Sequence, residues 1–402
     1  MSLKKSFLLL SLFFLLCGCG KKPPLLPSEK AVYHNNRGVT YLAQGDLDRA
    51  EFELLTAIEL NQKYAEARNN LALVYKTKGE YKKALQELEK ALKIDENYAS
   101  AHSQIGVIYM DQGKIDEAIT QLQTAIKKDP TAADTHYNLG LAWMKKAEEE
   151  NRPEYKKKAE ESWKKATELN PNLDYVHLRM AEYYRESGDF DLAIIRYRLA
   201  ISANPIAETW VRLGTLYLQK GDSFKAQNCF QEASQIDPNS KEALANLGIF
   251  FMEQKRFDEA EGVYQAIIQQ YPFDEQAYFH LGLAQIHLAE GDSTYWKKAI
   301  DSFAKAKQAN PDFSDASYNL GWAYLKSGDA LKAREEWEYT LTINPNHLQT
   351  LYNLGTLEQR QGEHGKTATY FCRFLKTEKG EFPAERKIVE QVLNQMGGSC
   401  QD

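Results

Sequence analysis

The chain has 402 residues, of which 43% are hydrophobic and 26% are charged, and its formal net charge is −6. This length is large for one compact core, so we expect several domains or an array of repeats. A mildly acidic chain is poorly suited to a phosphate backbone, so the charge argues against a nucleic-acid partner.

The first residues have the pattern of an export signal. Lys4 and Lys5 precede an apolar run over residues 7–16, which is shorter than the roughly 20 residues of a membrane-spanning helix. The run ends in LCGC (16–19), which resembles the lipobox of bacterial lipoproteins. That resemblance implies a signal peptide over residues 1–18 and lipid on Cys19. An ordinary cleaved signal or a short anchor is the alternative.

Residues 19–30 are expected to carry the lipid and to form a tether. The stretch GKKPPLLPSEK (20–30) contains three prolines, which favour an extended, semi-stiff spacer over a folded element. Gly20 follows the cysteine where an aspartate would signal retention, and this resembles the sorting pattern of lipoproteins of the outer membrane. We therefore expect a chain anchored to the outer membrane of a Gram-negative bacterium and facing the periplasm.

Regularly spaced prolines mark a repeat in the rest of the chain. Gaps of 34, 33, 34, 39 and 34 residues separate the prolines at positions 171, 205, 238, 272, 311 and 345. In the unit over residues 65–98, two apolar patterns with helical spacing are separated by Gly79. The pattern predicts two amphipathic helices per unit, joined by a short turn.

This pattern resembles the tetratricopeptide repeat. The resemblance implies an all-α, right-handed superhelical solenoid of about ten helix-turn-helix repeats over residues 31–380, with insertions at about 147–153 and 290–294. A helix over 381–396, starting near Pro383, is expected to cap the array before a short tail (397–402). First helices are expected to start at Ala31, Ala65, Ala99, Ala133, Asp174, Ala207, Lys241, Glu275, Ser314 and Leu348.

A polar side chain recurs two positions before the small residue of each first helix. An amide can both donate and accept a hydrogen bond, so a row of amides suits the main chain of an extended peptide. The row resembles the asparagine ladder of some tetratricopeptide superhelices, including those of the O-linked N-acetylglucosamine transferases. Alternatively, each side chain simply bonds to the adjacent helix. These ten ladder residues are Asn36, Asn70, Gln104, Asn138, Arg179, Arg212, Asn246, His280, Asn319 and Asn353.

Apolar side chains flank the ladder and predict the walls of a peptide-binding groove. The lysines of the family's carboxylate clamp are absent, so an amphipathic or extended protein segment fits better than an acidic C-terminus. Packing between helices is the alternative role for these positions. The predicted wall residues are Tyr137, Leu141, Phe279, Tyr318, Trp322 and Tyr352.

Two sequence features resemble functional sites, a set of histidines and a glycine-rich stretch, and we expect both to be structural. Histidines at positions 34, 102, 136 and 177 lie in different repeats, too far apart to share a metal, and are expected to pack against a neighbouring helix. The stretch GEHGKT (362–367) lacks the first glycine of a phosphate loop and follows a helix instead of a strand. We expect no metal, no cofactor and no catalytic residue.

Three cysteines follow the signal and the predicted lipid site: Cys229, Cys372 and Cys400. Export to an oxidising compartment allows disulfides, and Cys372 and Cys400 lie near the same end of the array. A disulfide between these two, or three free thiols, are the alternatives.

Together these patterns predict a non-enzymatic scaffold that binds a protein partner at a membrane surface. The combination most resembles the lipoproteins of type IV pilus assembly, which stabilise the secretin in the outer membrane. A scaffold for polysaccharide export, or a substrate-presenting subunit of an envelope enzyme, is the alternative. The sequence does not identify the partner.

Overall fold

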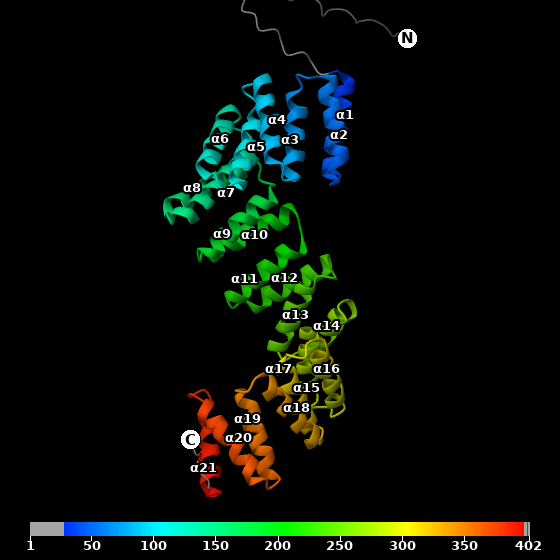
Figure 1. The fold of residues 1–402 in the computed structure, drawn as a ribbon, viewed down its shortest axis with the longest axis vertical. Coiled ribbons are helices and arrows are strands. Elements are labelled where there is room, and N and C mark those ends of the chain that lie inside the picture. The colour runs from blue at the N-terminus through cyan, green and yellow to red at the C-terminus, as the bar shows by residue number, and fades with distance from the viewer. Residues whose placement is uncertain (1–27, 398–399, 401–402) are drawn as a thin grey trace, which may run out of the picture. The chain divides into compact units, whose positions relative to one another are not determined.

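The part of the chain that the computed structural model describes, residues 28–397 and 400, contains 21 helices and no strand (Figure 1). The predicted signal peptide (1–18), Cys19 and most of the predicted tether lie outside the described residues. Over the described residues, none of the helices combines the length and the apolar character needed to cross a membrane.

The helices form ten consecutive pairs and one final helix, and the chain divides into two compact units. The first unit (Met1–Pro171) holds α1 to α8, and the second (Asn172–Asp402) holds α9 to α21. The first unit contains α1 (Glu29–Ala43), α2 (Leu47–Leu60), α3 (Ala65–Thr77), α4 (Tyr81–Ile94), α5 (Ala99–Asp111), α6 (Ile115–Lys128), α7 (Ala133–Glu150) and α8 (Pro153–Leu169). The second contains α9 (Asp174–Glu186), α10 (Phe190–Ala203), α11 (Ala207–Gln219), α12 (Ser223–Ile236), α13 (Lys241–Glu253), α14 (Phe257–Gln270), α15 (Glu275–Leu288), α16 (Tyr295–Ala309), α17 (Ser314–Lys326), α18 (Ala330–Ile343), α19 (Leu348–Arg360), α20 (His364–Thr377) and α21 (Pro383–Gln395).

The first helices of repeats 2 to 10 begin at the residues that the 34-residue period predicts. In repeat 1, α1 begins at Glu29, two residues before the predicted start, so the end of the predicted tether is helical. The side chain of Ser28 explains the earlier start, because its hydroxyl accepts a hydrogen bond from the backbone N–H of Ala31 at 3.3 Å.

The two helices of a repeat approach closely because the first one carries a small residue. In eight repeats this residue is a glycine that faces a large side chain of the second helix. A Cβ atom added to Gly321 would lie 2.5 Å from Nε1 of the fully buried Trp337, far inside van der Waals contact. The small residue is therefore a steric requirement of the pair, as the sequence pattern predicts.

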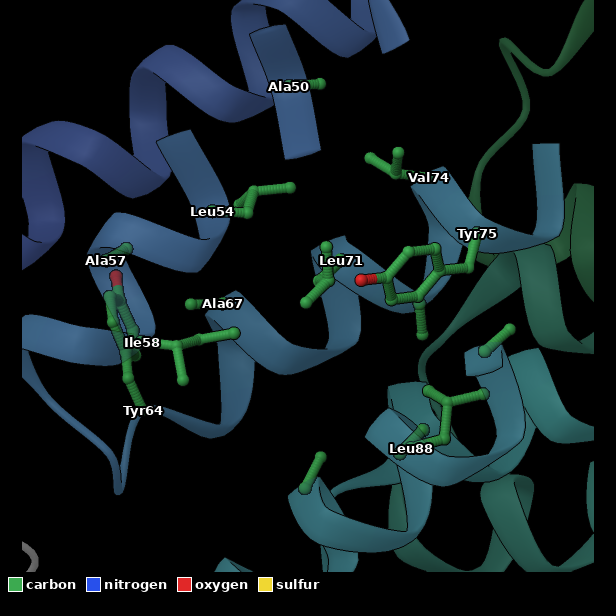
Figure 2. Close-up of a cluster of buried hydrophobic side chains, with 14 of the residues drawn as sticks. Ala50, Leu54, Ala57, Ile58, Tyr64, Ala67, Leu71, Val74, Tyr75 and Leu88 are labelled. Atoms are coloured by element: carbon green, nitrogen blue, oxygen red, sulfur yellow. The ribbon is translucent and has the colours of Figure 1, made fainter. Parts of the chain in front are cut away.

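Apolar side chains from successive helices build the core of the first unit. Figure 2 shows Leu54 of α2 and Leu71 and Val74 of α3 in the interior between these helices, and all three are at most 1% exposed. Leu88 of α4 extends the same cluster to the second helix of repeat 2 and is fully buried. Burying each such side chain contributes about 1.5–3 kcal/mol, so every repeat depends on its neighbours for its core.

The first insertion lengthens both helices of repeat 4. With 18 residues, α7 continues to Glu150, and Asn151 then turns in the left-handed region (φ 50°) before Pro153 opens the 17-residue α8. Trp143 and Tyr155 stack across the added turn with ring centroids 5.4 Å apart. The second insertion connects α15 to α16 through residues 289–294.

The last helix, α21, closes the second unit as the predicted cap. Val389, Val392 and Leu393 are buried, whereas Ile388 is 48% exposed. The structure joins Cys372 of α20 to Cys400 by a disulfide, with Cα atoms 5.4 Å apart. The segment after α20 is thereby attached to the repeat that precedes it.

Candidate functional site

Several ladder side chains bond to the first helix of the preceding repeat. Three of these bonds reach a residue 35 positions earlier in the chain, and the fourth links α11 to α9. The donors and acceptors are Asn70 Nδ2 to Asn35 Oδ1 at 3.0 Å, Gln104 Nε2 to the Asn69 carbonyl at 3.3 Å, Asn353 Nδ2 to Tyr318 Oη at 3.2 Å, and Arg212 Nη1 to Glu182 Oε1 at 2.6 Å. These ladder residues therefore join neighbouring repeats, whether or not they also contact a ligand.

The other ladder residues lie in more varied surroundings. Asn246 and Asn319 donate to backbone carbonyls of their own helices, Glu242 at 2.9 Å and Asp315 at 2.8 Å. Asn36 is exposed, and Asn138 and Arg179 are partly buried. The ring of His280 stacks on that of Tyr264 at 5.4 Å, and burial lowers the pKa of His280.

Arg212 is part of an ion-pair network inside the second unit. Glu182 accepts hydrogen bonds from Tyr197 Oη at 2.6 Å and from Arg185 Nη2 at 2.8 Å, in addition to the one from Arg212. Burial alone would raise the pKa of the Glu182 carboxyl, but these three donors outweigh burial and hold its pKa below the usual value. Because the Arg212 guanidinium binds both Glu182 and Glu208, this ladder residue has a structural role.

Two of the predicted wall residues, Phe279 and Leu141, are taken up by packing between helices, and a third, Tyr137, contacts a neighbouring helix through its backbone carbonyl. The ring of Phe279 lies 4.8 Å from that of Phe313 and 5.9 Å from that of Phe303. Leu141 packs against a buried cluster of the first unit, and the Tyr137 carbonyl accepts a hydrogen bond from Trp163 Nε1 at 3.3 Å. At these positions the structure agrees with the alternative reading, inter-helix packing.

The remaining three predicted wall residues converge at one place. A cavity of about 280 Å³ in the second unit, which we call the C-terminal pocket, combines two ladder asparagines with three predicted wall residues. It is lined by Ile286 of α15, Tyr318, Asn319 and Trp322 of α17, Gln349, Tyr352 and Asn353 of α19, Phe374 of α20, Phe382, and Glu385 of α21. The first helices of repeats 8, 9 and 10 and the capping segment all contribute to this pocket.

The C-terminal pocket combines apolar walls with a few polar groups, as ligand sites usually do. Asn319 and Asn353 donate through their amide nitrogens, and among the described residues their amide oxygens accept no hydrogen bond. Burial raises the pKa of Tyr318, although its bond from Asn353 acts in the opposite direction. The walls can therefore surround an apolar side chain while the amide oxygens accept from backbone N–H groups.

Sequence reasoning missed half of the pocket. Phe382 and Glu385 lie in the capping segment, which we expected only to cover the end of the array. Glu378 holds this segment in place: its carboxylate accepts from the backbone N–H of Phe382 at 2.9 Å and contacts Arg386 Nη1 at 3.1 Å. These bonds, led by that of Phe382, hold the pKa of Glu378 below its usual value. The sequence signal was an acidic residue shortly before a proline-initiated helix, too weak to identify the contact.

The four repeat-spaced histidines contact structural partners, in keeping with the packing interpretation. His34 and His102 each bond to a residue 19 positions later on the second helix of their own repeat, at 2.6 and 2.8 Å. His177 contacts Arg196 at the same separation, and His136 Nε2 lies 3.1 Å from a backbone carbonyl. Over residues 28–397 and 400, the structure has no cluster of three or more potential metal ligands.

A second cavity of about 280 Å³ lies between α10, α11 and α12, and its lining includes Trp210, Leu213 and Cys229. Burial raises the pKa of the Cys229 thiol to about 12, so this thiol is protonated at neutral pH. The residue that corresponds to Cys229 in repeat 8 is Ser302, whose hydroxyl donates a hydrogen bond to Gln285 at 2.7 Å. None of the predicted groove residues lines this cavity, so the C-terminal pocket is the candidate site.

Comparison with known proteins supports the repeat assignment. Models of the tetratricopeptide repeat match residues 31–64, 53–86, 74–113, 106–146 and 294–347. The model of the C-terminal domain of cilia and flagella-associated protein 70 matches residues 141–270.

Individual relatives are distant and mostly much longer. Superkiller protein 3 of Schizosaccharomyces pombe is 22% identical over 59% of this chain and 18% of its own length. BBSome complex member BBS4 of Bos taurus is 24% identical over 49% of this chain and 37% of its own length. Among solved structures, PilF of Pseudomonas aeruginosa is 26% identical and covers 54% of this chain and 95% of its own, with a TM-score of 0.44. The chain thus aligns with less than half of each of these two curated relatives.

Proposed function

Because this chain is a tetratricopeptide-repeat protein, we propose that it is a protein-binding scaffold whose C-terminal pocket holds an extended segment of a partner. One observation carries the proposal: Tyr318, Asn319, Trp322, Tyr352 and Asn353, all predicted from the repeat register, line a single cavity. The apolar part of a partner side chain lies among the aromatic walls, and the two asparagines accept hydrogen bonds from the partner's main chain.

The proposal predicts that pocket substitutions weaken peptide binding without unfolding the protein. Short random peptides displayed on phage are selected on the full chain, and one selected peptide is titrated by fluorescence anisotropy. Trp322→Ala is expected to weaken binding at least tenfold, because large aromatic anchors dominate binding energy. Asn353→Ala is expected to weaken it about threefold to tenfold through one lost hydrogen bond.

The matched control is Asn36→Ala, which changes an exposed ladder residue of the first unit, outside the pocket. It should leave the affinity unchanged, and circular dichroism should show the same helicity for all three variants. Equal affinities of the control and the two pocket variants would reject the pocket as the binding site.

We further propose that the scaffold is lipid-anchored through Cys19 and faces the periplasm, where it takes part in assembly of an envelope structure. The sequence LCGC (16–19), after a basic pair and a short apolar run, supports the anchor. A role in type IV pilus or secretin assembly follows from the resemblance described above. A scaffold for polysaccharide export, or a substrate-presenting subunit of an envelope enzyme, is the second candidate.

The anchor predicts that Cys19→Ser moves the protein from the membrane fraction to the soluble fraction. Without the thiol, the lipid cannot be attached, and stable membrane association depends on the acyl chains. The measurement is an immunoblot of fractionated Gram-negative cells that express the full chain. Cys17→Ser is the control and should remain with the membrane; retention of Cys19→Ser there would exclude lipid on this cysteine.

A further inference from the structure

Among the residues that line the C-terminal pocket, one is charged, and none of the residues that the structure describes forms an ion pair with it. Glu385 is the only ionisable acid or base among the pocket residues other than the tyrosines. It lies in the first turn of α21, is partly buried, and forms no ion pair with any residue that the structure describes. Glu385 therefore lines the cavity and has no ion-pair partner among the described residues.

The neighbouring cations are already engaged. Arg386 follows Glu385 in the chain, but its guanidinium contacts Glu378 at 3.1 Å and Glu390 at 3.0 Å. Lys326 places its ammonium 4.7 Å from the centroid of the Trp322 ring, at the wall of the pocket. Within the described residues, no cation pairs with Glu385, so its carboxylate is available to a cationic group of a ligand.

Five of the ten pocket residues are aromatic, and aromatic faces attract cations. The ammonium of Lys326 already lies over the Trp322 ring, so a cation of a ligand is expected to contact the other aromatic rings of the pocket. Tyr318, Tyr352 and Phe382 supply further rings, two of them with neighbouring amide groups from Asn319 and Asn353. A planar guanidinium both stacks on rings and pairs with a carboxylate in a bidentate manner, so it satisfies both features together.

We propose that the C-terminal pocket selects a partner segment that carries an arginine, with its guanidinium against Glu385 and its stem among the aromatic rings. The inference rests on the proposed function, because it names the side chain that the peptide site recognises. A site of this kind prefers a positively charged group, whereas a site that recognises an acidic C-terminus prefers a negatively charged one. The net charge of −6 adds a long-range attraction for a basic partner.

The test compares charge-matched changes on both sides of the contact. Peptides selected on the full chain should be enriched in arginine, and replacement of that arginine by the neutral isostere citrulline should weaken binding about fivefold to tenfold. Glu385→Gln should cause a similar loss for the arginine peptide and almost none for the citrulline peptide. The control Glu381→Gln removes the same charge from an exposed residue just before α21 and should have little effect.

The outcomes separate this inference from the proposed function. If Trp322→Ala weakens binding while Glu385→Gln and the citrulline peptide do not, the pocket binds peptides but the arginine assignment is wrong. If Glu381→Gln costs as much as Glu385→Gln, only the overall charge matters, and the assignment is again wrong. The arginine assignment is supported if the loss of affinity is specific to the pair of Glu385 and arginine and becomes smaller at high salt.

Discussion

Arg334→Met is expected to destabilise repeats 9 and 10 by about 3–5 kcal/mol, because it leaves a buried carboxylate without its counter-charge. Glu358 of α19 is fully buried, and Arg334 of α18 reaches it across the boundary between the two repeats. Nε of Arg334 lies 2.6 Å from Oε1 of Glu358, and Nη2 donates to Oε2 at 3.1 Å. Without the guanidinium, the Glu358 carboxylate is left charged and unpaired where water cannot reach it.

The double variant Arg334→Met with Glu358→Leu separates this effect from loss of packing. Buried ion pairs can often be replaced by apolar residues of similar volume without loss of stability, so the double variant should return to within about 1 kcal/mol of the wild type. Hydrogen exchange of α17 to α20 measures the stability of these repeats apart from the rest of the array. A double variant as unstable as the single one would show that the side-chain stem, not the stranded charge, is responsible.

The repeat register was predictable because it rests on local and periodic constraints. A glycine or alanine is needed wherever two helices touch, and a chain reversal is needed after each helix, so both recur every 34 residues. The earlier start of α1 escaped prediction because it depends on Ser28, a capping residue outside the period. Repeat 7 also departs from the periodic pattern, because Lys255 adopts φ 57° at the turn where most other repeats have a glycine.

The candidate site was only half predictable. Tyr318, Trp322 and Asn353 follow from the register of the repeats, and the structure places them together. Phe382 and Glu385 do not, because the capping segment has no period and its position depends on bonds from the buried Glu378. The register also could not show that several ladder amides link neighbouring helices, since bonding to a ligand and bonding to a helix require the same residue type.

Gly321→Ala is expected to destabilise repeats 9 and 10 by about 1–3 kcal/mol, although alanine is the better helix former. Helix propensity alone favours alanine over glycine by about 1 kcal/mol. At this position the new Cβ would lie 2.5 Å from Nε1 and 2.6 Å from Cδ1 of Trp337, and 3.1 Å from the Ala333 carbonyl oxygen. Trp337 is fully buried and its indole N–H donates to the Tyr318 carbonyl at 3.0 Å, so the ring cannot move away without losing that bond.

Gly262→Ala is the matched control, because it makes the same change within a helix where nothing obstructs the new atom. Gly262 is exposed in α14, and no heavy atom lies within 4 Å of the added Cβ. This variant should therefore gain about 0.5–1 kcal/mol, the opposite sign from Gly321→Ala. Hydrogen exchange of the altered repeat in each variant measures both effects. If both substitutions stabilise the protein, the close approach of α17 and α18 does not constrain the repeat, and the small residue at this register requires another explanation.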